Sequence, residues 1–157
     1  MATGTPALVE LARLGIDFTL REYDHDPAAA SFGLEAAEKL GLPADQVFKT
    51  LVADVDGNHV VAIVPVNHQV SLKLLARAVN GKKAAMADPT VAQRITGYVV
   101  GGISPIGQKK KLVTVIDETA ELWDTVLVSG GRRGLDIELA PSDLARACDA
   151  IFAAIAD

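Results

Sequence analysis

The sequence predicts an α+β fold in which a mixed, barrel-like β-sheet is flanked by helices. Residues 47–64 read as two apolar strands joined by the turn Asp56-Gly57-Asn58, a pattern typical of a β-hairpin. Other short strand patterns follow in hairpin-like order, and segments with helical spacing lie between them. The chain has 157 residues, of which 50% are hydrophobic. We therefore expect one domain, residues 1–157, with a substantial buried core.

The N-terminal segments predict a helix, a strand and a second helix. Thr5-Pro6 supplies a cap residue and a proline at the first helical position, and Gly15 ends this helix. A loop is expected at 24–27 and a second helix at 34–40. Gly41 and Pro43 are expected to end this helix. Residues 16–23 alternate in polarity as a half-buried strand. Its inward side chains are expected to be Ile16, Phe18 and Leu20.

A lysine stands on the more apolar face of the first hairpin strand. Side chains alternate along a strand, so Lys49 shares a face with an apolar set. That set is Val47, Leu51, Ala53 and Val55. Lys49 either extends its ammonium group to solvent at a sheet edge or directs its charge into a pocket. We favour the pocket because glycine-rich segments that suit an anion occur later in the chain.

After the hairpin, Ser71 caps a helix that ends at Asn80-Gly81, and residues 82–87 form a short strand candidate. Asp88-Pro89 begins a further helix that runs through Ile95. A glycine-rich loop is expected at 98–111.

The C-terminal part predicts strands at 113–116, 125–128 and 135–139, with a turn at 130–134 before the last of them. A final helix is expected after Pro141-Ser142. Its apolar face is expected to carry Leu144, Ala147, Cys148, Ile151 and Ile155.

Composition narrows the functional classes. The net charge is −5 and the pI is about 5.1, which argues against sequence-independent binding to a nucleic-acid duplex. Lys82-Lys83, residues 109–111 and Arg132-Arg133 are short basic clusters that mark either a local anion site or solvated surface. One cysteine excludes a disulfide framework, and no apolar run approaches 18 residues. We expect a soluble, cytoplasmic protein.

The glycine-rich segment 101–109 suits an anion, because glycines let backbone N–H groups approach an oxyanion or a phosphate. It is not a nucleotide-binding P-loop. Gln108 stands where the lysine of that motif belongs, no Ser or Thr follows Lys109, and a strand follows instead of a helix. A purely structural glycine loop is the alternative.

A second glycine-basic turn, residues 129–134, precedes Asp136. Its serine lacks the flanking glycines of a nucleophile elbow. Asp136 alternates with apolar residues of the following strand. It therefore lines the solvated face, or it binds a ribose hydroxyl or Lys49.

Other catalytic groups are scarce. His25, His59 and His68 lack the spacing of metal ligands, and Cys148 is expected in the core. No Ser-His-Asp arrangement is defensible, and we expect neither a metal ion nor a cofactor. The residues thus predict a phosphate-bearing ligand and little conventional catalytic machinery.

Several motifs, in a fixed order along nearly the whole chain, carry a resemblance. They are Tyr23 before His25-Asp26-Pro27, Phe32-Gly33, Phe48-Lys49-Thr50-Leu51, Met86-Ala87-Asp88-Pro89, residues 97–110 and residues 129–138. Together they resemble the YbaK family of aminoacyl-tRNA deacylases, which is related to the editing domain of bacterial prolyl-tRNA synthetases. The resemblance implies the same barrel-like core flanked by helices.

The resemblance also implies a function and a site. It implies a trans-acting hydrolase that clears Cys-tRNA(Pro), which forms when prolyl-tRNA synthetase attaches cysteine to tRNA(Pro) by mistake. Lys49 would contact the phosphate or ribose of the terminal adenosine, and Gly101 would offer its N–H to the ester carbonyl. The expected catalytic residues are therefore Lys49, Gly101 and Asp136. The expected substrate-binding residues are Tyr23, Phe32, Thr50, Gly102, Ile103, Ser104, Ser129 and Gly130.

The implied mechanism needs no protein nucleophile, because the thiol of the substrate attacks its own ester carbonyl and a cyclic thiolactone leaves the tRNA. Two alternatives stay open. One is a deacylase for another mischarged tRNA such as Ala-tRNA(Pro), and the other is a non-catalytic module that binds tRNA ends or the synthetase. The expected partners are mischarged tRNA(Pro) and prolyl-tRNA synthetase. An acidic protein is expected to bind tRNA weakly by itself, so a complex with the synthetase would supply specificity for the tRNA body. No membrane and no DNA partner is expected.

Overall fold

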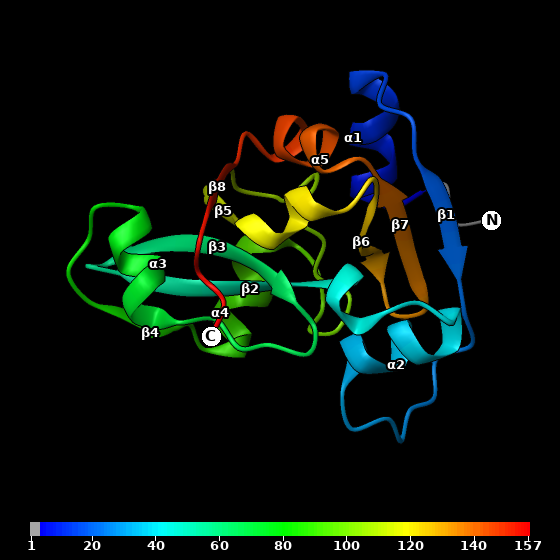
Figure 1. Cartoon of the computed structure of the whole chain (residues 1–157), viewed down its shortest axis with the longest axis horizontal. Helices are drawn as coiled ribbons and strands as arrows, with labels where there is room; N and C mark the ends of the chain where they lie inside the picture. The colour runs from blue at the N-terminus through cyan, green and yellow to red at the C-terminus, as the bar shows by residue number, and fades with distance from the viewer. Residues whose placement is uncertain (1–3) are drawn as a thin grey trace.

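The computed structural model describes residues 4–157, which form helices around two β-sheets (Figure 1). The helices are α1 (Pro6–Leu14), α2 (Phe32–Leu40), α3 (Leu72–Ala78), α4 (Pro89–Thr96) and α5 (Pro141–Cys148), with 3-10 turns η1 (Ala44–Gln46) and η2 (Glu118–Leu122). The strands are β1 (Thr19–Glu22), β2 (Phe48–Val55), β3 (Asn58–Pro65), β4 (Ala84–Met86), β5 (Val113–Asp117), β6 (Val126–Arg132), β7 (Leu135–Leu139) and β8 (Ile151–Ala153). The predicted α+β class is confirmed.

The larger sheet has the strand order β4-β2-β3-β5-β8 and is mixed. The predicted hairpin is its centre: β2 and β3 pair antiparallel from Phe48 opposite Pro65 to Val55 opposite Asn58. The turn residues Asp56 and Gly57 both have positive φ, 53° and 90°, as a tight two-residue hairpin turn requires. β5 pairs parallel with β3 and with β8, and β4 forms the other edge.

The smaller sheet, β1-β7-β6, is antiparallel and stands beside the larger one. One parallel bridge, from Val47 to Leu127, connects the two. Closure into a barrel requires every strand to be paired on both sides. In the described chain β1, β4 and β8 are sheet edges, so the expected barrel-like sheet is corrected to two adjoining sheets.

Capping residues set most helix ends as predicted. Thr5, Ser71 and Asp88 each accept a backbone N–H of the first turn of α1, α3 and α4. The second helix begins earlier than expected, because the Ser31 hydroxyl accepts the Leu34 N–H at 3.3 Å and thereby caps α2. Phe32 and Gly33 are therefore helical, which matters for the site below.

Three local expectations are wrong. Leu20 is 39% exposed, because β1 is a short edge strand with little packed over it. The last helix ends at Cys148, where Asp149 takes a left-handed conformation, so Ile151 belongs to β8 and is exposed. β6 continues through Arg132 with a register shift after Ser129, so the turn expected at 130–134 is shorter.

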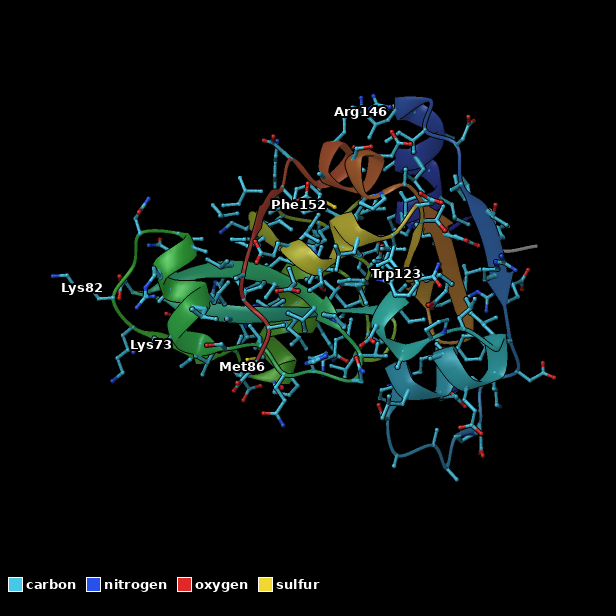
Figure 2. The ribbon with its side chains drawn as sticks, viewed as in Figure 1. Lys73, Lys82, Met86, Trp123, Arg146 and Phe152 are labelled. Carbon is cyan, nitrogen blue, oxygen red and sulfur yellow. The ribbon has the colours of Figure 1, made fainter. Side chains whose placement is uncertain are left out.

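The core fills both faces of β2. Phe48 and Val52 pack with Tyr98 and Ile106, whereas Ala53 and Val55 pack with Leu75 of α3. Cys148 is buried, as predicted. No helix in the described part of the chain combines the length and apolar character needed to cross a membrane. Figure 2 shows the side chains that fill the space between the sheets and the surrounding helices.

Candidate active site

A cavity of about 370 Å³ lies where the two sheets, α2 and α4 meet. The first half of β2 forms one wall, and the N-terminus of α2 and the β4–α4 junction form others. Val100, Gly101 and Ile103 of the glycine-rich loop and two residues of the smaller sheet complete the lining. Eight residues predicted for the site line it: Tyr23, Phe32, Lys49, Thr50, Gly101, Ile103, Ser129 and Asp136.

Lys49 brings a positive charge to this cavity. Burial lowers the pKa of its ammonium group. Within residues 4–157, no carboxylate forms an ion pair with it. An ammonium group that is partly desolvated and unpaired is suited to bind an anionic ligand.

Asp136 is the buried acid of the cavity, with 6% of its surface exposed. Burial raises its pKa to about 7. On β7 it stands directly opposite Ser129 of β6 and Arg21 of β1. The Arg21 guanidinium is engaged by Glu138 instead, through two donors to Oε1. Asp136 therefore has no counter-charge among the described residues, and its proton is exchangeable near neutral pH.

Gly101 and Ile103 bring the backbone of the glycine loop to the cavity lining. Val100 and Gly102 donate their N–H groups to Gln93 Oε1 and Val99 O, both at 2.9 Å. Within the described chain no acceptor takes the N–H of Gly101 or Ile103. Gly101 has φ +88°, and a Cβ there would stand 2.7 Å from the Phe32 ring. Only glycine fits this position without a shift of its neighbours.

Arg133 fixes the position of this loop. Its Nε and Nη2 donate to Val100 O at 2.9 and 2.7 Å, and its guanidinium carbon lies 4.6 Å from the centroid of the Phe32 ring. One side chain thus ties the β6–β7 turn to α2 and to the residue before Gly101. Sequence reasoning noted Arg133 as part of a basic cluster and missed this role.

Three residues that carry hydroxyl groups, Tyr23, Thr50 and Ser129, line the cavity together with Lys49 and Asp136. Burial and the charge of Asp136 raise the pKa of Tyr23 to about 12, so its phenol stays protonated. Thr50 Oγ1 is buried without a hydrogen-bond partner among residues 4–157. Ser129 Oγ accepts the Gly131 N–H at 3.1 Å. The cavity therefore offers hydroxyls to a polar ligand beside Lys49 and Asp136.

Three predicted binding residues lie outside the cavity lining, and their role stays a prediction. Ser104 is fully buried and accepts the Ile106 N–H at 3.2 Å. A Cβ on Gly102 would meet the Arg132 backbone, and one on Gly130 would meet Leu135.

Sequence reasoning missed part of the lining. The residues concerned are Ala30, Ser31, Gly33, Ala36, Val47, Phe48, Leu51, Val52, Met86, Ala87, Pro89, Ala92 and Val100. Two signals were available. Ser31 stands three residues before Leu34 as an N-cap, and Met86-Ala87-Asp88-Pro89 is one of the resemblance motifs.

The described residues hold no activated protein nucleophile. Burial raises the pKa of Cys148 to about 12, and its thiol donates to Pro105 O. His25 Nδ1 contacts Glu35 and His68 Nδ1 contacts Asp157 O, and no Ser, Thr or Cys in residues 4–157 hydrogen-bonds to a histidine. No group of three or more His, Cys, Asp or Glu in that part of the chain is placed to hold a metal ion.

Comparisons with known proteins agree on one family. The family described as aminoacyl-tRNA editing domain matches residues 26–147. A protein of Enterococcus faecalis, provisionally named the Cys-tRNA(Pro)/Cys-tRNA(Cys) deacylase EbsC, is 42% identical over 122 residues, which cover 76% of this chain and 73% of that protein. The multifunctional Ser/Thr-tRNA deacylase ProXp-y of Escherichia coli K12 is 31% identical over 142 residues, or 87% of this chain and 82% of that one.

A solved structure supports the fold. It is provisionally described as a trans-editing enzyme for prolyl tRNA synthetase, and it superposes with a TM-score of 0.82 over 97% of this chain and 95% of its own. Its sequence identity is 22%, so this likeness bears on the fold alone.

Proposed function

The chain belongs to the aminoacyl-tRNA editing domain family, and from this membership we propose that it is a hydrolase that removes cysteine from mischarged Cys-tRNA(Pro). One observation supports this function most directly. Among residues 4–157, a single cavity contains a lysine and a buried acid that form no ion pair and backbone N–H groups without acceptors, and the same residues supply no nucleophile with its base. Such a site suits a reaction in which the substrate brings its own nucleophile.

In the proposed complex, different residues of the lining bind different parts of the substrate. Lys49 binds the phosphate or ribose oxygens of the terminal adenosine, where negative charge offsets the desolvation of its ammonium group. Tyr23, Thr50 and Ser129 offer hydroxyls to the ribose and the amino acid. A volume of about 370 Å³ accommodates the aminoacyl ribose end and leaves the rest of the tRNA outside.

The ester is cleaved by the cysteine side chain. The substrate sulfur attacks the ester carbonyl, a carbon–sulfur bond forms, and the carbonyl oxygen gains negative charge that the N–H groups of Gly101 and Ile103 stabilise. The carbon–oxygen bond to the ribose then breaks. The proton that leaves the sulfur ends on the ribose oxygen, carried by Asp136, whose pKa is about 7. Water later opens the released thiolactone to cysteine.

Positioning supplies most of the acceleration in this scheme. Orientation of two reacting groups is worth on the order of 7–11 kcal/mol when they are held in contact. The walls that hold the aminoacyl group against the Gly101 loop are packed on Phe32 and Arg133. The enzyme therefore needs a rigid cavity more than it needs reactive side chains.

A second candidate is removal of serine or threonine, and Ala-tRNA(Pro) also remains an alternative substrate. The similarity to a relative named a Ser/Thr-tRNA deacylase favours the former, as does the buried Thr50 Oγ1, which lacks a partner in residues 4–157 and would accept a substrate hydroxyl. Serine and threonine esters lack the thiol, so their release would require water as nucleophile.

The partners follow from this role. The substrate is a mischarged tRNA, tRNA(Pro) in the first instance, and prolyl-tRNA synthetase is the source of the error. We place the protein with both in the cytoplasm. A complex with the synthetase would hold the tRNA near an acidic enzyme of net charge −5.

The test is a deacylation assay with purified protein on four mischarged substrates: tRNA(Pro) charged with cysteine, with alanine, with serine and with threonine. The expected result is fast release of cysteine that is lost in Lys49→Ala. Release of serine or threonine at a comparable rate would favour the second candidate. An inert protein that still binds tRNA ends would instead support a non-catalytic binding module.

A further inference from the structure

The charges of this acidic chain are strongly segregated. Residues 57–116 contain eight Lys and Arg and a single acid, Asp88, for a net charge of +7. The remaining 97 residues contain seven Lys and Arg and nineteen acids, for a net charge of −12. The overall value of −5 therefore hides a basic segment that runs through β3, α3, β4, α4 and the glycine-rich loop.

Folding gathers much of this charge at one end of the larger sheet. The backbone N–H groups of Lys82 and Lys83 donate to the Asp56 carboxylate at the tip of the β2–β3 hairpin. Lys110 and Lys111 line a hollow of about 510 Å³ beside the same tip. We call the exposed cations of this end the basic surface: Lys73, Arg77, Lys82, Lys83, Lys110 and Lys111. Figure 2 shows Lys73 and Lys82 extending outward from this end.

Few carboxylates compensate the basic surface. Asp149 pairs with Lys111 at 3.2 Å. Asp54 and Asp56 lie at the hairpin and accept backbone N–H groups there. The side chains of the other five cations form no ion pair with any residue in 4–157. Six cations against these three carboxylates leave the basic surface with a net positive charge, which attracts a polyanion.

The short strand β4 connects the basic surface to the cavity. Met86, at one end of β4, lines the cavity, and Lys83 precedes the other end. A strand rises about 3.3 Å per residue, so Lys83 lies roughly 10 Å along the chain from Met86. Nucleotides in a stacked strand advance about 3.4 Å each, so this distance corresponds to about three nucleotides.

We propose that the basic surface binds backbone phosphates of the tRNA strand whose 3′ end enters the cavity, from about the third nucleotide before the terminal adenosine onward. The inference rests on the proposed function. Lysine ammonium groups bind phosphates as point charges, and aromatic residues are only 4% of the chain, so contact is with the backbone rather than with stacked bases. The protein thus has an RNA-binding surface of its own despite its acidic net charge.

The test compares two double variants that remove the same charge. Lys82→Gln/Lys83→Gln removes two cations of the basic surface, and the backbone N–H groups that bind Asp56 remain. Arg13→Gln/Arg146→Gln removes two exposed cations on α1 and α5, and Figure 2 shows Arg146 at a different part of the molecule. Each protein is assayed on Cys-tRNA(Pro) and on the cysteinyl ester of adenosine, and its affinity for uncharged tRNA(Pro) is measured across a salt series.

The surface variant is expected to raise KM for Cys-tRNA(Pro) and Kd for uncharged tRNA about three- to tenfold at low salt, with kcat unchanged. The slope of log affinity against log salt should become shallower by about 1–2, because two phosphate contacts are lost. Hydrolysis of the adenosine ester should match wild type in both variants, which also shows that they are folded.

Equal KM, Kd and salt slopes in the two variants would overturn the proposal. So would a defect that appears only when prolyl-tRNA synthetase is added, since the surface would then contact protein. If wild type hydrolyses neither ester, the proposed function fails, and the binding measurements on uncharged tRNA still decide whether the basic surface contacts RNA.

Discussion

The guanidinium of Arg133 lies over the ring of Phe32, 4.6 Å from its centroid, and both Nε and Nη2 donate to the carbonyl of Val100. The peptide that carries this carbonyl also carries the N–H of Gly101. The cation–π contact and the two hydrogen bonds therefore fix a peptide whose second residue, Gly101, lines the cavity.

Arg133→Ala should lower kcat for cysteine release about tenfold and change KM little. Loss of one oxyanion donor costs on the order of 10²–10³ in kcat, and this variant only loosens such a donor. Arg133→Lys should recover part of the rate. The matched control is Arg132→Ala, because within residues 4–157 the Arg132 side chain bonds only to Glu22 and the Arg133 carbonyl. Equal defects at both positions would mean that charge, not loop geometry, matters.

Gly101→Ala should inactivate the enzyme because its Cβ would lie 2.7 Å from the Phe32 ring and 2.9 Å from Arg133 Nε. Gly57→Ala is a close control. Gly57 has a similar φ, +90° against +88°, but open space around its Cβ position. Both variants should lose roughly 1–2 kcal/mol of unfolding free energy from the left-handed backbone. Only Gly101→Ala should lose deacylation, and comparable activity in the two variants would contradict the assigned role of the loop.

Lys49→Met should abolish deacylation and raise the melting temperature. Burial lowers the pKa of Lys49, so its charged form is less favourable in the folded than in the unfolded protein, and an apolar replacement removes that cost. A gain of about 1 kcal/mol corresponds to roughly 2–4 °C for a domain of this size. Lys49→Arg keeps the charge and should retain partial activity. Thermal scans and deacylation rates of the three proteins test this trade-off, and a lower melting temperature in Lys49→Met would contradict it.

Asp136 should make stability fall as pH rises. Its pKa is raised from 3.8 to about 7, so between those values the folded state retains a proton that the unfolded chain has released. The stability contribution is therefore fully present below pH about 4 and is lost as pH rises through about 7. Asp136→Asn, which stays neutral, should melt several degrees above wild type at pH 8 and close to it at pH 4. A constant difference across that range would contradict the raised pKa.

The pH dependence of deacylation should also reflect the ionisation of Asp136. If Asp136 accepts the thiol proton, kcat/KM for Cys-tRNA(Pro) should rise through an inflection near pH 7. Asp136→Asn should remove the inflection and lower the plateau by about 10²–10⁴. Rates measured between pH 5.5 and 8.5 decide between this role and a purely structural one, which would leave the inflection in place.

The fold was predictable where local chemistry decides it. Asp56-Gly57 specifies the hairpin, and Thr5, Ser71 and Asp88 specify helix starts, because capping and turn geometry depend on a few adjacent residues. The division into two sheets was not predictable, since it depends on which distant strands pair. The exposure of Leu20 likewise depends on β1 being an edge strand, which no local pattern reveals.

The same distinction between local and long-range interactions applies to the site residues. Lys49 and Asp136 were identified as charges within apolar alternation, and the structure places both at one cavity. The alternatives for each, a solvent-directed Lys49 and an Asp136 on a solvated face, could be decided only in three dimensions. Arg133 was missed because its role comes from contacts with Phe32 and Val100, residues that lie 101 and 33 positions away in the chain.

The most direct test of the central claim compares two substrates that differ by one group. Single-turnover release is measured from Cys-tRNA(Pro) and from tRNA(Pro) charged with 2-aminobutyrate, in which a methyl group replaces the thiol at nearly the same size. Thiol-assisted cleavage predicts fast release of cysteine, with a thiolactone as first product, and release of aminobutyrate no faster than its spontaneous hydrolysis. Comparable enzymatic rates for the two would show that water is the nucleophile and would contradict the account.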